Sequence, residues 1–198
     1  MVIGTSARRA HEQRFAKLFN GLYIRHLPRV LINTTTSRLY HKAEQASAFE
    51  SLPIFNELIS SMTTRIDYVR IKREARQYFR YVVLSHKWEE NEPLFQQVMH
   101  IAVYDLDESP THDKLQTFCK IVRDAGFNWA WSDTCCINKS DHFVLQEALI
   151  AMFKWYQGSA MMIVFLRGVR SGTLVPGHFR NILLPRSSTS TQRTGLST

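Results

Sequence analysis

The chain has 198 residues, 44% of them hydrophobic and four of them tryptophan, which excludes wholesale disorder and allows a sizeable buried core. No apolar run approaches the roughly 20 residues that cross a bilayer, and the three cysteines fit neither a disulfide framework nor metal-ligand spacing. The net charge of +8 is uneven: residues 1–80 hold 14 Lys/Arg against 6 Asp/Glu, whereas residues 81–170 hold 8 against 11, which argues against nucleic acid as a partner of the core.

Residues 1–28 predict a basic amphipathic helix. Large apolar side chains between Phe15 and Tyr23 fall on one helical face, and Glu12 is the only acid among several arginines. We expect this helix to dock on the domain or on a partner in a cytoplasmic protein. A mitochondrial presequence has the same composition and stays an alternative.

Residues 29–80 predict a leader hairpin followed by helices that pack on the domain. Val30–Ile32 favours a strand, the next five residues a turn, and Leu39–Tyr40 a returning strand. Residues 42–80 predict two or more helices with a break near Pro53. The arginine-rich end of this region predicts a solvated face; a basic adaptor for nucleic acid or acidic lipid is the alternative.

Residues 81–170 predict the α/β core. Apolar runs at 81–84, 129–131 and 161–166 favour strands, and the segments between them have helical periodicity. Strands alternating with helices indicate a small, mostly parallel sheet flanked by helices. Residues 171–198 predict a disordered or truncated tail, rich in serine and threonine.

The two core helices have clear end signals. Ser109 and Pro110 form a good helix start, and Gly126 a good left-handed stop. The second helix can be capped by Ser140 or Asp141. Its predicted inward stripe consists of Leu145, Ala148, Leu149, Met152 and Tyr156.

Polar side chains follow two of the predicted strands directly. In an open α/β sheet, ligands bind at the carboxyl ends of the strands, where loops and helix amino termini converge. The sequence therefore predicts a site for a polar, ring-containing ligand at this edge. The candidate pocket residues are Ser85, His86, Trp88, Asp133, Cys136 and Asn138.

Each candidate has a structural alternative. Asp133 serves equally well as a cap for the turn that follows it. Ser85 and His86 are neighbours on a strand and point to opposite faces, so they do not form a nucleophile–base pair. Buried packing is favoured for Cys136, because no basic cluster lies near it in the sequence. Glu147 lies opposite the apolar stripe, which favours a solvated glutamate.

Several motifs occur in a fixed order. Leu84–Trp88 reads LSHKW, Trp131–Asn138 reads WSDTCCIN, and a Glu-to-Ala helix motif spans 147–160. Together they resemble the signature of the fungal heterokaryon-incompatibility (HET) domain, and Arg29–Tyr40 is similar to the leader of this domain in mushroom-type fungi. The resemblance covers about residues 28–170.

The resemblance implies a fold of TIR or flavodoxin type and a role in fungal non-self recognition and regulated cell death. Partners would be further copies of the chain or other incompatibility proteins, and no cofactor is required. Some TIR domains cleave NAD with a helix-borne glutamate. By that analogy Glu147 is a catalytic residue, NAD is a substrate, and Ser85, Trp88 and Asp133 shape the pocket.

The carboxyl-terminal part departs from the family pattern. Larger HET proteins continue into a W-T-x-Q-E motif, but residues 174–198 contain neither tryptophan nor glutamate. We therefore expect a short or truncated member of the family, with a sheet edge that lacks its usual cover.

Overall fold

The computed structural model of the chain describes residues 13, 21, 26–60, 68–165 and 181–183. The strands are β1 (Val30–Asn33), β2 (Leu39–His41), β3 (Tyr81–His86), β4 (Trp129–Trp131), β5 (Met161–Phe165) and β6 (Asn181–Leu183). The helices are α2 (Lys42–Glu50), α3 (Pro53–Ser60), α4 (Tyr68–Tyr78), α5 (Phe95–Val98), α6 (Pro110–Asp124) and α7 (His142–Gly158), with a 3-10 turn η2 (Val103–Asp105). The amphipathic helix expected at residues 1–28 lies almost entirely outside the described residues.

The strands form one mixed sheet in the order β2-β1-β4-β3-β5-β6. Strand β3 pairs in parallel with β4 and β5, and β5 pairs in parallel with β6. Strand β1 pairs antiparallel with both β2 and β4. The α/β class is confirmed, but the sheet is mixed rather than mostly parallel, because a hairpin joined by a tight turn is antiparallel and the leader adds it to one side.

The leader and the core share this sheet. Ile32 of β1 is paired with Ala130 of β4, so the predicted boundary at residue 80 separates two segments of one packed unit. At the other edge, β6 falls within residues 171–198, for which the sequence predicts a disordered or truncated tail. The three residues of β6 instead extend the parallel side of the sheet, and the rest of that stretch lies outside the described residues.

The hairpin turn is built by polar side chains at the predicted position. The side-chain oxygen of Asn33 accepts hydrogen bonds from the backbone N–H groups of Thr35 and Thr36, at 3.0 and 2.9 Å. Ser37 takes a left-handed conformation with φ of 51°, and the Asn33 N–H then donates to the Arg38 carbonyl at 2.9 Å. The turn is therefore determined locally, as its sequence indicates.

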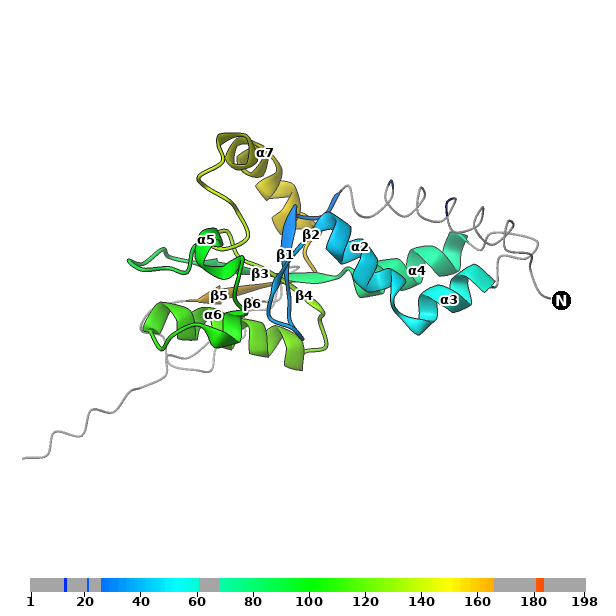
Figure 1. Cartoon of the computed structure of the whole chain (residues 1–198), viewed down its shortest axis with the longest axis horizontal. Helices are drawn as coiled ribbons and strands as arrows, with labels where there is room; N and C mark the ends of the chain where they lie inside the picture. Colours follow the sequence, from blue (N-terminus) through cyan, green and yellow to red (C-terminus); the bar gives the residue numbers. More distant parts are fainter. Residues whose placement is uncertain (1–12, 14–20, 22–25, 61–67, 166–180, 184–198) are drawn as a thin grey trace, which may run out of the picture.

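The helices surround the sheet at different places. Helix α6 lies below the sheet and α7 above it in the view of Figure 1, while α2, α3 and α4 gather at one end. Both end signals of α6 are confirmed: Ser109 caps His112 N–H at 3.2 Å, and Gly126 follows the helix with φ of 80°. Asp141 is the cap of α7 and accepts from the N–H groups of Phe143 and Val144.

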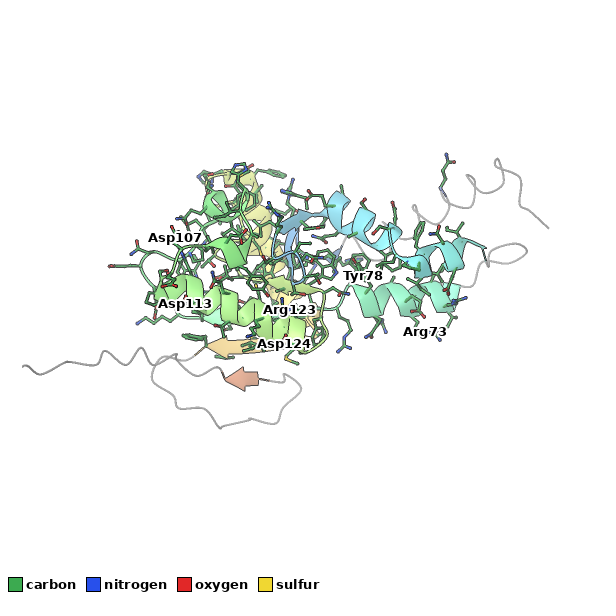
Figure 2. All side chains as sticks on the ribbon, turned by 60° about the horizontal axis from the view of Figure 1, so that its bottom comes forward. Arg73, Tyr78, Asp107, Asp113, Arg123 and Asp124 are labelled. Atoms are coloured by element: carbon green, nitrogen blue, oxygen red, sulfur yellow. The ribbon has the colours of Figure 1, made fainter. Side chains whose placement is uncertain are left out.

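The centre of the core is the short strand β4. Trp129 and Trp131 are fully buried. Trp129 packs against Tyr78 of α4, at 5.8 Å between ring centroids, and Tyr78 lies where α4 meets the sheet (Figure 2). Trp131 packs against Trp155 of α7 at 5.7 Å. The two tryptophans thus connect the sheet to the helices at its end and to α7.

Helix α7 follows the predicted inward stripe at every position except Leu149. Ala148 and Trp155 are buried, and Leu145, Met152 and Tyr156 pack partly against the core. Leu149, predicted to point inward, is instead 58% exposed. Each helical residue turns about 100° from its neighbour, so an inner face centred on Ala148 and Trp155 places Leu149 outside.

Within the described residues, none of the helices combines the length and the apolar character needed to span a bilayer.

Candidate functional site

The parallel pairing of β3 and β4 brings two polar segments to one edge of the sheet. Tyr81 is in register with Trp129, and Val83 with Trp131. The residues after these strands therefore leave the sheet at its carboxyl edge. This position matches the one that the sequence predicts for a ligand site.

Trp88, Asp133 and Lys139 meet there and form what we call the strand-end cluster. The indole Nε1–H of Trp88 donates to Asp133 Oδ2 at 2.9 Å. The Lys139 ammonium lies 3.4 Å from the centroid of the Trp88 ring, which is a close cation–π contact. Burial lowers the pKa of Lys139, and the negative charge of Asp133 offsets part of that effect.

The strand-end cluster presents an aromatic side chain to solvent in a fixed orientation. Trp88 is 55% exposed although two charged groups hold its ring. The sequence proposes either a capping or a ligand-binding role for Asp133. In the structure, the Asp133 carboxylate accepts a hydrogen bond from the indole of Trp88. A carboxylate, an ammonium and an exposed indole together suit contact with a polar partner or ligand.

The turn from Ser132 to Cys136, which carries Asp133, is held together by its own hydrogen bonds. The Cys136 N–H donates to the Ser132 carbonyl at 2.9 Å, and the Ser132 N–H donates to Cys136 Sγ at 3.5 Å. Ser132 and Thr134 hydroxyls are 2.8 Å apart. Burial raises the pKa of the Cys136 and Cys119 thiols well above the usual value, so they stay protonated near neutral pH. Cys136 lies buried inside the turn rather than facing solvent.

Asn138 fastens this loop to a neighbouring helix. Its side-chain oxygen accepts from Gln96 Nε2 of α5 at 2.8 Å and from the Ser140 hydroxyl at 2.7 Å. Gln96 Nε2 also lies 2.7 Å from the Ser140 hydroxyl. Asn138 therefore positions the segment between Lys139 and the start of α7, and its role as a ligand contact stays a prediction.

His86 belongs to a separate buried charge cluster, which also contains Glu92 and Lys114. The His86 side chain is only 1% exposed, and its Nε2 lies 3.5 Å from Glu92 Oε2. Lys114 of α6 forms an ion pair with Glu92 Oε1. Burial of Glu92 favours a raised pKa, but the nearby imidazole and ammonium outweigh it and hold the pKa below its usual value. Ser85, half-buried, is in register with Val164 of β5.

Glu147 lies apart from these residues, on the surface of α7. Its Oε2 forms an ion pair with Arg29 Nη1 at 2.6 Å, and the two side chains are 43% and 45% exposed. Burial lowers the pKa of nearby Lys42, an effect that Glu147 partly offsets. Among the described residues, its ion pair is with the leader and not with the strand-end cluster. The predicted catalytic role of Glu147 remains a prediction.

The sequence did not single out five residues that organise these clusters. Lys114 carried a usable signal: a lysine beside Leu115 and one turn before Phe118 faces the core and requires a buried acid. The other four residues carry no such signal in the sequence, since their partners are distant in the chain. They are Arg29, Glu92, Gln96 and Lys139.

A basic groove lies on α4, away from these clusters. It has a volume of about 500 Å³ and is lined by Val69, Lys72, Arg73, Arg76, Gln77 and Arg80. Arg73 lies on the outer side of α4 in Figure 2, and the Arg80 guanidinium lies 4.9 Å from the Phe127 ring centroid. This exposed face agrees with the solvated helix face that the sequence predicts.

Comparisons with known proteins agree on the core. Residues 81–194 match the family model described as "Heterokaryon incompatibility protein (HET)". A stretch of 95 residues is 37% identical to the "Vegetative incompatibility protein HET-E-1" of Podospora anserina. This stretch is 45% of the chain but only 6% of that relative, so the chain spans a small part of it. No solved structure matches the chain.

Proposed function

Since the family match covers more than half of its residues, the chain belongs to the heterokaryon incompatibility (HET) family, and we propose that it is an effector of fungal non-self recognition and regulated cell death. The match over residues 81–194 is the observation that carries this proposal, because it contains the strand-end cluster and α7. The vegetative incompatibility protein of Podospora anserina supports it as a relative.

We further propose that the protein acts by self-association or through partner proteins. The exposed indole of Trp88 supports this mode, since its hydrogen bond to Asp133 and the ammonium of Lys139 hold it in one orientation. A large aromatic side chain that is ordered before binding loses little entropy on contact. Such residues carry much of the binding energy in protein interfaces.

The test is induced expression in a fungal host, with cell viability as the readout. We expect the wild-type chain to kill cells, and Trp88→Ala and Asp133→Ala to suppress killing at equal protein levels. Glu108→Ala, an exposed change outside the cluster, is the control. Undiminished killing by both cluster variants would show that the strand-end cluster is not the effector surface.

An enzymatic version of this function is a separate proposal: NAD glycohydrolase activity with Glu147 as the catalytic residue. The exposed carboxylate, oriented by Arg29, supports it by being open to a ligand. Purified protein should then consume NAD, and Glu147→Gln should abolish the activity without changing thermal stability by more than a few degrees. Glu108→Gln is the matched control. Equal turnover by wild type and Glu147→Gln, or none by either, would refute this proposal.

A further inference from the structure

Helix α7 is apolar on two opposite faces, and only one of them is covered in the described structure. Ala148 and Trp155 face the core. On the outer side, Phe143 is 74% exposed, Ile150 79% and Phe153 70%, next to Leu149. A helix that is apolar all round is normally buried all round. Figure 1 shows α7 on the outside of the molecule, above the sheet.

The outer face has the spacing of a helix-pairing seam. Its residues recur at alternating steps of three and four, the pattern with which two helices pack side by side. The seam, which we call the α7 seam, consists of Phe143, Gln146, Ile150, Phe153 and Gln157, with Leu149 on one flank. Glu147 and Lys154 lie one heptad apart on the other flank.

We infer that the α7 seam binds the α7 seam of a second copy of this chain, with the two helices antiparallel. A two-fold axis near Ile150 places Glu147 of each copy beside Lys154 of the other, twice over. A parallel arrangement would instead set this flank of each helix against the Leu149 flank of the other, so that neither charge pair forms. The flanking charges therefore favour the antiparallel arrangement.

The size of the seam fits a weak, self-complementary dimer. A Phe side chain has about 150–250 Å² of surface, so the four exposed apolar side chains offer on the order of 500 Å² per copy. Two copies would bury about 1,000 Å², the lower limit of specific interfaces. Glu147 is 43% exposed while paired with Arg29, so its carboxylate is open to Lys154 of a second copy.

This inference names the partner in the self-association that we propose as the mode of action. The first experiment is sedimentation of the full chain over a range of micromolar concentrations. We expect reversible dimers of two 23.1-kDa chains. Ile150→Asp should raise the dimer dissociation constant by about 30-fold or more, as loss of an interface hot spot does.

The matched control is Val69→Asp on α4, because Val69 and Ile150 are equally exposed at 79%. It should leave the dimer unchanged, and thermal melting should show that both variants fold. A wild-type chain that stays monomeric at all concentrations overturns the inference and indicates another occupant of the seam, such as the amino-terminal segment. Equal weakening by both variants overturns it as well.

Charge exchange tests the antiparallel arrangement. Lys154→Glu and Glu147→Lys should each weaken their own homodimers by about 10-fold, because like charges then meet twice. An equimolar mixture of the two variants should dimerise as wild type does, since every cross-pair is again opposite in sign. A mixture that is no tighter than either variant alone contradicts the pairing.

Disulfide trapping tests the position of the axis. The three native cysteines are buried, so an introduced surface cysteine is the reactive one. Ile150→Cys should form a covalent dimer on oxidation. Phe143→Cys should not, because seven residues rise about 10.5 Å and the two sulfur-bearing positions lie roughly 21 Å apart, far beyond the approximately 7 Å that a disulfide allows. Efficient trapping through Phe143→Cys overturns the antiparallel model.

The two proposals can fail separately. Killing that persists with Ile150→Asp, in a chain whose dimer is lost in solution, leaves the dimer standing and removes self-association from the proposed function. Killing by a strictly monomeric wild type refutes the dimer and leaves action through other partners.

Discussion

Removal of the Lys114 ammonium should destabilise the core strongly. Lys114 and Glu92 are 4% and 8% exposed, and their ion pair lies beside the buried His86 ring. In Lys114→Met, the Glu92 carboxylate stays buried without the ammonium that pairs with its Oε1. Breaking a buried pair from one side costs about 3–5 kcal/mol, which corresponds to a fall in Tm of about 10 °C for a chain of this size.

The contribution of Glu92 to stability depends on pH with a definite sign. The folded-state pKa of Glu92 lies below its usual 4.5, so its contribution to stability is present above that pH and is lost as the pH falls through the folded value. Without Lys114 the folded pKa rises. We therefore expect the stability of Lys114→Met to change less steeply than that of wild type as the pH falls below 4.5.

Urea unfolding and thermal melts measure both effects. Lys120→Met, an exposed lysine on the same helix, is the control and should change stability by less than about 0.5 kcal/mol. The double variant Glu92→Gln/Lys114→Met should recover part of the loss, because it leaves no unpaired charge. If Lys114→Met melts within about 2 °C of wild type, the buried pair does not stabilise the core.

Three further predictions concern other parts of the fold. Trp129→Ala should cost about 3–5 kcal/mol in urea unfolding, because the buried ring contacts Tyr40, Tyr78 and Phe79; a loss below about 1 kcal/mol would contradict its central place in the core. Gly126→Ala should cost about 1 kcal/mol through its φ of 80° alone, since a Cβ there meets no atom within 4 Å, and an unchanged Tm would refute this. Binding of nucleic acid or anionic vesicles to the basic groove of α4 should be weak; affinity that falls steeply with salt and is lost in Arg76→Ala would instead support the adaptor alternative.

Local signals predicted much of the secondary structure correctly. The caps at Ser109 and Asp141, the turn at Asn33 and the left-handed Gly126 involve atoms within a few residues of each other. Their energies depend little on the rest of the fold, so the sequence predicts them well. The mixed character of the sheet had no such signal, because the pairing of β1 with β4 joins residues about 100 positions apart.

The candidate site was likewise predictable only in part. The motif order correctly predicted a polar edge after β3 and β4, and the family match confirms the recognition of the family. The distribution of the residues over that edge depended on packing. Trp88 and Asp133, 45 residues apart, meet at the surface, whereas His86 and Cys136 turn into the core and Glu147 pairs with Arg29 across 118 residues.

The sequence by itself determined the family, the alternation of strands and helices in the core, and several of the residues at which these elements begin or end. These properties follow from neighbouring residues and from motif order. Tertiary structure decided where the covered face of α7 ends: Trp131 packs against Trp155, and Leu149, which the sequence places inward, is left exposed. The same packing leaves Ile150 and Phe153 outside, and so creates the surface on which we expect a second copy to bind.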